Sequence, residues 1–492
     1  MVHLPILRAG RTYRSLDVVR LSDIASGEPV AEVSQANRGL IARDLQLAGR
    51  NRERLARIPF AELLSICRRA SGLFAEGELP IDGDATQSAG RYIDQVSATT
   101  GMPRALARSN MEKIRFVLAE MDRVLRGLTR GLDLDILDGG WGDENGRTVS
   151  YLSEARVLGA VLPNNSPGVH SLWIPSIALR VPVMLKPGRQ EPWTPLRIAR
   201  ALQEAGCPPE AVGFYPSDHA GAAEILLRSC RSMLFGDGAT LDAWRDDPRV
   251  QLHGPGWSKV LIGADRIDSW EDQIDLIIGS IADNGGRSCV NASGVWVPAR
   301  GREVAETLAA RLAAIPALPL DHPEARLAAF SSPRQAHGIS AYIDRMLAVP
   351  GAEDVTRRLR GRDRVGEVGG CTFLLPTVIR CDDPEHPLAA AEFLFPFAAV
   401  VEVPQDDMVE RIGPTLVASV LSEDEGWRRA LLNSPDIDRL NLGPIATNSV
   451  CWDQPHEGNL FEHLYRQRAL QSVAMTGPPV RVDPAGAPGG GS

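Results

Sequence analysis

The spacing of apolar residues separates a helical N-terminal part of the chain from a part in which strands and helices alternate. Residues 37–75 and 104–132 place apolar side chains three or four positions apart, which predicts amphipathic helices. From about residue 156, short apolar runs alternate with helical stretches, and this alternation predicts βαβ units around a parallel sheet. The predicted strands are 155–163, 181–186, 212–216, 232–236, 251–254 and 259–263, and the predicted helices are 171–180, 194–206 and 221–229.

Two further changes of pattern divide the chain. Extended runs on either side of Gly-Asp-Glu-Asn-Gly predict a long hairpin within residues 133–155. A second alternating region starts near Cys289, with predicted strands at 293–298, 372–379, 398–404 and 446–450 and a predicted helix at 301–315. The C-terminal end is Gly-rich, and we expect it to be disordered.

Composition and charge exclude several classes of protein. The chain has 492 residues, of which 44% are hydrophobic and 23% charged, as is typical of a globular protein with two or three packed units. The formal net charge of -9 argues against nucleic acid or an anionic membrane as the main partner. No apolar run is long enough to cross a membrane, and no signal peptide is expected. The seven cysteines include no C-x-x-C pair, so we expect reduced thiols in a cytoplasm.

The basic residues are almost all arginine. Only Lys113, Lys186 and Lys259 are lysines among 53 basic residues, so a lysine here marks a candidate for a position that needs a compact ammonium group. None of the three follows a glycine, which excludes a P-loop. The sequence has no H-E-x-x-H, G-x-S-x-G or G-x-G-x-x-G motif and no histidine cluster. Metal hydrolases, serine hydrolases and a bound metal are therefore not expected.

One free cysteine lies at the junction between a predicted helix and a predicted strand. The helix ends at Asn284-Gly285-Gly286, and Cys289 follows on a short link. Consecutive glycines permit a close approach of the backbone, so a thiol at this place can face a cleft beside backbone N–H donors. Arg287 could favour the thiolate, although most free cysteines are buried and inert.

Six segments strengthen the case for Cys289 as a nucleophile, because their order and spacing resemble the aldehyde dehydrogenase superfamily. That family has a Pro-x-Asn-x-Pro turn, a lysine that ends a strand, a Phe-x-Gly turn and an Asn-x-Gly-Gln-x-Cys stretch, followed by Gly-x-x-x-x-Pro-Thr and Glu-x-Phe-Gly-Pro segments. The corresponding residues here are Pro163–Pro167, Lys186, Phe235–Gly238, Asn284–Cys289, Gly370–Thr377 and Glu392–Pro396. The resemblance spans about residues 155–450.

The resemblance implies an oxidoreductase that oxidises an aldehyde with NAD or NADP through a thioester on Cys289. The family stabilises the oxyanion with an asparagine amide and the cysteine N–H, here Asn165 and Cys289. It holds cofactor ribose hydroxyls with the lysine and the later glutamate, here Lys186 and Glu392. From the sequence alone, Asn165 could instead cap a helix, and Glu392 could be a solvated edge carboxylate. The other candidates for cofactor binding are Pro163, Arg189, Phe235 and Gly236.

Three departures from the family pattern bear on the chemistry. Hydrolytic members carry a glutamate that activates water, but the corresponding stretch Leu252–Lys259 contains no carboxylate. This absence favours coenzyme A over water as the acyl acceptor, and it makes an acyl-CoA reductase working in reverse conceivable. His253 could instead act as the base, or it could be a packed histidine at a strand end. Three residues after the lysine, the family has a glutamate that contacts the adenosine ribose, but Arg189 stands there in this chain. Arg189 could bind the 2′-phosphate of NADP, whereas Glu191 in the same loop could restore the ribose contact. Leu394 replaces the family's phenylalanine near the nicotinamide.

The expected fold is α/β and aldehyde dehydrogenase-like, with a Rossmann-type nucleotide-binding domain, an α/β catalytic domain and a β-hairpin oligomerisation arm. The resemblance implies a homodimer or homotetramer that acts on a small-molecule aldehyde. The alternative is a catalytically inactive homologue that serves as a structural subunit. The expected parts are 1–132 (helical part of the cofactor-binding domain), 133–155 (hairpin arm), 156–285 (NAD(P)-binding domain), 286–450 (catalytic domain) and 451–492 (C-terminal tail with an oligomerisation strand).

Overall fold

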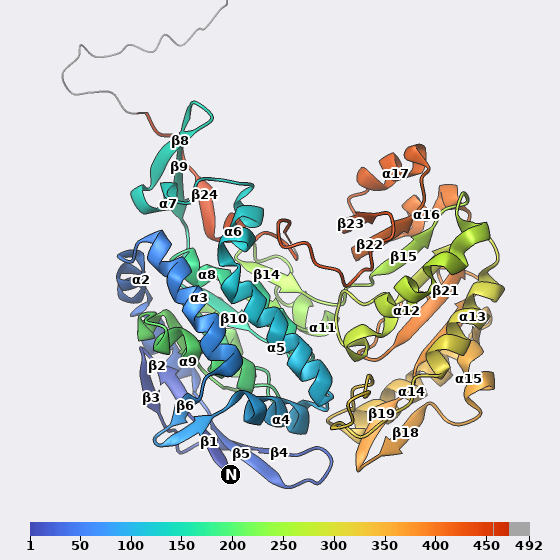
Figure 1. Cartoon of the computed structure of the whole chain (residues 1–492), viewed down its shortest axis with the longest axis horizontal. Coiled ribbons are helices and arrows are strands. Elements are labelled where there is room, and N and C mark those ends of the chain that lie inside the picture. The colour runs from blue at the N-terminus through green and yellow to red at the C-terminus, as the bar shows by residue number, and fades with distance from the viewer. Residues whose placement is uncertain (456, 472–492) are drawn as a thin grey trace, which may run out of the picture.

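The structure, a computed structural model, describes residues 1–455 and 457–471 and contains two lobes (Figure 1). The first lobe is built on a seven-stranded sheet with the order β14-β13-β10-β11-β12-β2-β3. The strands from β10 to β14 are parallel, which confirms the predicted βαβ pattern. The bounds are β2 (Ile6–Arg8), β3 (Arg11–Tyr13), β10 (Leu158–Val161), β11 (Val183–Lys186), β12 (Val212–Phe214), β13 (Arg231–Phe235) and β14 (Val250–His253).

The second lobe contains another seven-stranded sheet, with the order β17-β20-β21-β16-β15-β22-β23. Because β15 already belongs to this sheet, the chain passes from the first sheet to the second at residues 254–258, upstream of the boundary expected at 285. The bounds are β15 (Lys259–Ile262), β16 (Gly294–Val297), β17 (Ala352–Asp354), β20 (Thr377–Cys381), β21 (Phe397–Glu402), β22 (Thr415–Leu421) and β23 (Ile437–Leu442).

Residues 446–450 do not form the predicted strand. Their polar groups bind the end of helix α12 (Ile274–Ala282) instead of a neighbouring strand: the N–H of Thr447 donates to the Ser280 hydroxyl, and the Asn448 amide donates to the Gly279 carbonyl. The edge of the second sheet is formed by β23, which lies just upstream.

Helices cover both sheets (Figure 1). The predicted helical region 37–75 contains three helices, the last of which starts after Pro59, a residue without an N–H to donate. The predicted helix 171–180 is not continuous: a 3₁₀ turn (Pro167–Leu172) is followed by the short α8, which begins at Pro175. No helix within the described residues combines the length and the apolar character that a membrane crossing requires. The remaining bounds are α1 (Arg38–Leu45), α2 (Ala48–Ala56), α3 (Phe60–Glu76), α4 (Ala89–Thr100), α5 (Arg104–Ala119), α6 (Met121–Thr129), α7 (Ile136–Gly139), α8 (Pro175–Ala178), α9 (Trp193–Glu204), α10 (His219–Arg228), α11 (Gly238–Asp242), α13 (Gly301–Ala313), α14 (Pro333–Leu347), α15 (Val355–Arg360), α16 (Gln405–Arg411), α17 (Glu425–Leu432) and α18 (Leu460–Leu464).

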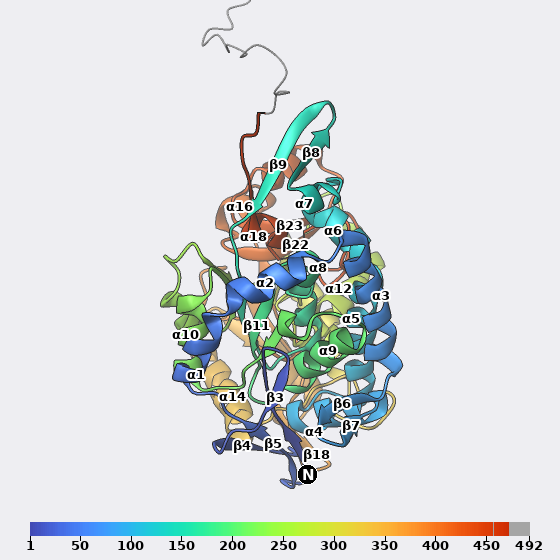
Figure 2. The same cartoon turned by 90° about the vertical axis from the view of Figure 1, so that its left-hand side faces the viewer.

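A hairpin projects from the first lobe, as predicted (Figure 2). Its strands β8 and β9 are antiparallel, and the C-terminal strand β24 pairs with β9. The Gly-rich stretch expected to be disordered falls within 472–492, outside the described residues. The bounds of the smaller sheets are β1 (Val2–Leu4), β4 (Val18–Ser22), β5 (Pro29–Ser34), β6 (Leu79–Asp82), β7 (Ala85–Gln87), β8 (Trp141–Glu144), β9 (Arg147–Ser153), β18 (Val365–Val368), β19 (Cys371–Leu374) and β24 (Tyr465–Gln467).

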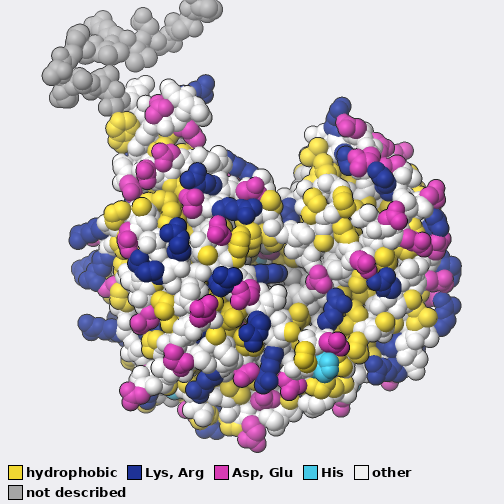
Figure 3. Space-filling model, viewed as in Figure 1, with side chains coloured by type: hydrophobic (Ala, Val, Ile, Leu, Met, Phe, Trp, Pro, Cys, Tyr) yellow, Lys and Arg dark blue, Asp and Glu magenta, His cyan; other side chains and the backbone are white. Residues whose placement is uncertain are grey.

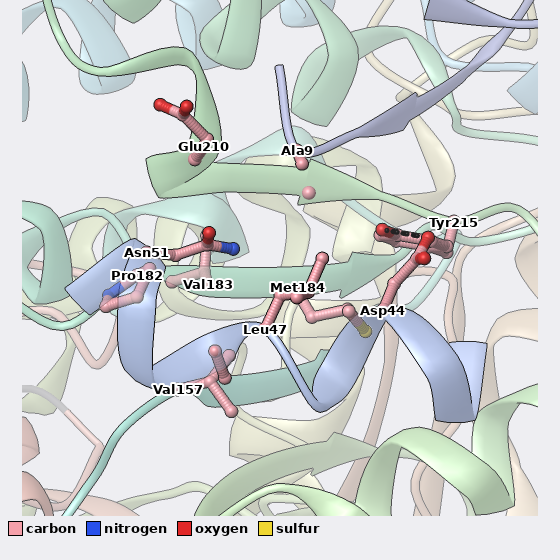
Figure 4. A pocket seen from close by; sticks show the side chains of 12 residues that line it. Ala9, Asp44, Leu47, Asn51, Val157, Pro182, Val183, Met184, Glu210 and Tyr215 are labelled. Atoms are coloured by element: carbon pink, nitrogen blue, oxygen red, sulfur yellow. Dashed lines mark hydrogen bonds between the residues drawn. The ribbon is translucent and has the colours of Figure 1, made fainter. Parts of the chain in front are cut away.

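A small cavity lies between α1, α2 and the first sheet (Figure 4). Beside it, the Tyr215 hydroxyl donates to Asp44 at 3.0 Å, and Arg8 donates to the same carboxylate at 2.6 and 2.7 Å. The volume of about 20 Å³ has room for a single water-sized molecule. This cavity therefore belongs to the packing of the N-terminal helices and is too small for a substrate.

Candidate active site

A cleft of about 1130 Å³ brings together all the site residues proposed from the sequence. It is lined from both lobes, and Figure 3 shows the surface hollowed between them. Strands β10, β11, β13 and β14 all end at this cleft, which is the usual place for a ligand in an open α/β sheet. The proposed residues that line it are Pro163, Asn165, Lys186, Arg189, Phe235, Gly236, His253, Cys289 and Glu392.

The turn before Cys289 requires its glycines. Gly285 and Gly286 adopt left-handed φ angles of 69° and 67°, and a Cβ on Gly286 would lie 2.4 Å from the carbonyl carbon of Phe395. After the turn, the Ser258 hydroxyl donates to the Cys289 carbonyl at 2.9 Å. The half-buried thiol is thereby held at a fixed point of the cleft.

The Cys289 thiol contacts a carboxylate that the sequence analysis missed. Sγ lies 3.1 Å from Oε1 of Glu457, a residue just upstream of α18. Burial raises the pKa of Cys289 well above its usual value, and the charges of Glu457 and Glu392 raise it further. The sulfur is therefore protonated at neutral pH in the free protein, and a base is needed to make it nucleophilic.

Arg287 does not act as expected from the sequence. Its guanidinium donates to the Thr100 carbonyl at 2.7 Å and also to the Ala329 carbonyl, and it lies 5.7 Å from the ring centre of Phe330. Burial lowers its pKa to about 10. The expectation that Arg287 favours the thiolate was wrong, because its guanidinium donates to the backbone carbonyls of Thr100 and Ala329 and not to the sulfur.

Asn165 lies in the turn that follows β10. Its amide nitrogen donates to the Arg287 carbonyl at 3.0 Å, and a primary amide has a second N–H for another acceptor. The helix cap at this place is Ser166, whose hydroxyl accepts from the N–H of Gly168. The alternative that Asn165 serves as the cap is therefore wrong, and its amide is fixed beside the Cys289 loop.

The loops after β10 and β11 form a cradle that fits a dinucleotide. A Cβ on Gly188 would lie 2.3 Å from the Pro163 carbonyl oxygen, so the two loops cross in close contact. Lys186 ends β11 beside them, and burial lowers its pKa although the charge of Asp218 opposes this shift. An ammonium group and tightly crossing loops at the carboxyl edge of a parallel sheet suit ribose hydroxyls and a pyrophosphate.

Glu191 is turned away from this cradle. Its side chain is buried, accepts from the N–H and hydroxyl of Thr194 at 2.9 and 2.7 Å, and lies 3.1 Å from Nε2 of His170. It is absent from the cleft wall, whereas Arg189 lines it. Of the two residues suggested for a ribose or 2′-phosphate contact, only Arg189 faces the cleft.

Two carboxylates from other parts of the chain border the stretch 252–259, which has none of its own. Glu392 accepts from the N–H groups of Gly256 and Trp257 at 2.9 and 2.5 Å, yet burial raises its pKa to about 7. Nδ1 of His253 lies 3.2 Å from Oε2 of Glu457, and the histidine ring stacks on Phe235. Glu392 is therefore no solvated edge residue.

Comparison with known proteins identifies the family. Residues 13–426 match the sequence profile of the Aldehyde dehydrogenase family. The chain is 28% identical over 273 residues to aminoacetaldehyde dehydrogenase of Pseudomonas aeruginosa, an alignment that covers 52% of each protein. It is 32% identical over 179 residues to human aldehyde dehydrogenase 1A1, covering 32% of this chain and 35% of that protein. The chain thus aligns with about half, or less, of these relatives.

Solved structures share the fold over nearly the whole chain. The aldehyde dehydrogenase KauB from Pseudomonas aeruginosa gives a TM-score of 0.76 at 17% identity and covers 95% of this chain and 96% of that one. A NAD-dependent benzaldehyde dehydrogenase from Corynebacterium glutamicum gives a TM-score of 0.75 at 16% identity, with 94% and 97% covered. These low identities speak for the fold alone, and they confirm the expected α/β architecture. Because the family profile matches most of its length, the chain belongs to the aldehyde dehydrogenase family.

Proposed function

We propose that this protein oxidises an aldehyde with NAD or NADP through a thioester on Cys289 and passes the acyl group to coenzyme A or to water. The observation that carries the proposal is the cleft that Cys289 and Asn165 share with Lys186 and Glu392. A thiol, an amide donor and a cradle for a dinucleotide in one place suit this chemistry. We further propose a cytoplasmic homodimer or homotetramer that uses the hairpin β8–β9 as its arm.

The first chemical step is an addition to the aldehyde. The S–H bond of Cys289 breaks and its proton passes to a basic side chain of the cleft, an S–C bond forms to the carbonyl carbon, and the carbonyl π electrons move to oxygen. The Asn165 amide and the Cys289 N–H donate to that oxyanion, which such donors stabilise by roughly 3–4 kcal/mol each. A bound nicotinamide supplies the acceptor for the hydride that converts the adduct into a thioester.

The residues that would hold the cofactor lie at the carboxyl edge of the first sheet. Lys186 and Glu392 would bind ribose hydroxyls, and Pro163, Phe235 and Gly236 would line the cradle around the cofactor. Arg189 faces the same cleft and would pair with a 2′-phosphate, which favours NADP. Leu394 is 37% exposed at the cleft wall and leaves more room there than the family's phenylalanine would.

Removal of the acyl group is the step on which the two acceptors differ. The stretch 252–259 carries no carboxylate of its own, which favours coenzyme A, because its thiol needs no strong base. Glu457, which comes from the C-terminal segment to the Cys289 thiol, keeps water open as the second acceptor. His253 lines the cleft as a candidate base for water.

Turnover with and without coenzyme A, each with NAD and with NADP, tests the proposal directly. We expect aldehyde-dependent formation of NAD(P)H and its loss in Cys289→Ala. Full activity of Cys289→Ala would overturn the thioester. No reduction of either cofactor across a panel of aldehydes would favour the second candidate, an inactive homologue that serves as a structural subunit.

A further inference from the structure

Among the described residues, a carboxylate from the C-terminal segment lies within hydrogen-bond distance of the catalytic thiol. Glu457 reaches Cys289 Sγ with Oε1 at 3.1 Å and His253 Nδ1 with Oε2 at 3.2 Å. One carboxylate therefore bridges a thiol and an imidazole. The imidazole and the carboxylate are both buried, since the side chains of His253 and Glu457 are 5% and 8% exposed.

Strand β14 holds Glu457 through two residues on the same face. Gln251 donates its amide to the Glu457 carbonyl at 3.1 Å, and His253, two positions on, contacts the carboxylate. Gly458 follows with a left-handed φ of 71°, and Asn459 donates to the Leu128 carbonyl at 2.8 Å. The backbone that follows the carboxylate is thus anchored to the first lobe.

Charges of both signs surround this bridge. Glu392 and Asp438 place further negative charge near Glu457. Burial and the charge of Glu457 raise the pKa of Glu392 and of Asp438. Arg439 lies within electrostatic range of Glu457 and Cys289 and opposes this negative charge. In the described part of the chain, His463 also lies within electrostatic range of His253; burial lowers its pKa to about 4, so it is neutral at pH 7.

We propose that Glu457 is the general base that takes the proton from the Cys289 thiol, and that His253 positions it. The proposal rests on the proposed function above, because it assigns the proton acceptor for the same nucleophile. The Sγ–H bond breaks toward Oε1, an O–H bond forms, and the sulfur electron pair attacks the carbonyl carbon. The charge that leaves the carboxylate appears on the substrate oxygen, so atoms and charge balance without a further reactant.

Neither of the other two candidates is placed as well to accept this proton. Glu392 already accepts two backbone N–H groups, and the thiol hydrogen bond goes to Glu457. His253 contacts Glu457 through Nδ1 and stacks on Phe235 with ring centres 4.4 Å apart, which fixes its ring. It therefore acts through the carboxylate, as a positioning residue.

Alkylation of Cys289 by iodoacetamide tests the base without aldehyde or cofactor. Glu457→Gln keeps the shape of the side chain and removes its basicity, so we expect the alkylation rate at pH 7 to fall about tenfold or more. If Glu457 is only a nearby negative charge, its removal lowers the thiol pKa and alkylation becomes faster. A faster or unchanged rate would therefore overturn the proposal.

Two controls make the measurement specific. Peptide mass spectrometry separates Cys289 from the exposed Cys451, whose rate serves as the internal reference. Glu462→Gln removes an exposed glutamate of the neighbouring α18 and should leave the Cys289 rate unchanged. A rate that falls as much in Glu462→Gln as in Glu457→Gln would point to a general effect of charge and contradict the assignment.

The pH profile and two histidine variants separate a base from its positioner. The parent rate should show a limb that rises below alkaline pH, and Glu457→Gln should lose this limb and respond only at alkaline pH. His253→Leu should slow alkylation, whereas His253→Asn, with a donor near the Nδ1 position, should restore much of it. Equal loss in both histidine variants would instead make His253 the base and overturn the proposal.

The outcome is distinguishable from a failure of the proposed function. If Cys289→Ala retains aldehyde oxidation, the thioester proposal fails whatever Glu457 does. If Cys289→Ala is inactive but Glu457→Gln keeps both rapid alkylation and the initial burst of NAD(P)H, only the assignment of the base fails. With the base removed, we expect that burst to slow about 100-fold or more.

Discussion

At the scale of single residues, Lys186 tests whether the scarcity of lysine has a chemical meaning. Its ammonium group ends β11 at the cleft wall. Lys186→Arg keeps the charge but replaces the compact ammonium group with a larger, planar guanidinium, so we expect the affinity for the cofactor to fall about tenfold. Calorimetric titration with NAD and NADP measures this. Lys113→Arg, on α5 and outside the cleft, is the matched control, and equal affinity in both variants would refute the argument.

The titration of Glu392 predicts a pH-dependent stability. Burial raises its folded pKa to about 7, above its ordinary value of 4.5, so the folded state binds this proton more tightly than the unfolded state. The resulting stabilisation is present below about pH 4.5 and is lost as the pH rises to about 7. Glu392→Gln should therefore gain stability relative to the parent between pH 5 and pH 8. Chemical denaturation at both pH values measures this, with the exposed Glu367→Gln as control. A constant difference between parent and variant would contradict the assignment.

Local motifs predicted the residues that belong to short segments of sequence, and missed those that depend on distant contacts. Cys289, Asn165 and Lys186 each lie in a recognisable turn or strand end, and all three line the cleft. Glu457 lies 168 residues from Cys289 in a stretch without pattern, so only the folded chain shows their contact. Arg287 was misjudged for the same reason, because its carbonyl partners come from other segments.

At the scale of elements, the turn between Glu457 and α18 predicts a functional effect of a small substitution. Gly458 has a φ of 71°, and a Cβ there would lie 1.9 Å from the Gln251 amide nitrogen. Gly458→Ala should cost about 1–2 kcal/mol of stability and displace Glu457, which slows alkylation of Cys289. Gly146→Ala, at the open hairpin turn with a φ of 77°, has the same backbone strain without the contact. Equal Cys289 rates in the two variants would show that the turn does not position the base.

Helices and strands with a regular spacing of apolar residues were predicted well. Features that depend on which strand or helix an element packs against were not. Strands β10 to β14 follow from apolar runs between helices, and the hairpin follows from its turn residues. The assignment of β15 to the second sheet could not be predicted, because apolar runs do not say which neighbour they pair with. The strand predicted at 446–450 failed because its polar groups bind the end of α12.

At the scale of the whole molecule, the projecting hairpin predicts how copies of the chain associate. The hairpin of β8 and β9 projects from the first lobe (Figure 2). Its side chains Trp141 and Leu152 are 53% and 38% exposed, and apolar side chains on a projecting arm are stabilised when a partner covers them. We expect light scattering to give a dimer or tetramer for the parent. The double substitution Trp141→Glu and Leu152→Glu should lower the mass, because it places charge in the covered surface. Leu432→Glu changes an exposed residue on α17 of the other lobe and should leave the mass unchanged. An unchanged mass in the double variant would exclude the arm as the contact, whereas cofactor binding should survive in either case, since the cleft is lined by other residues.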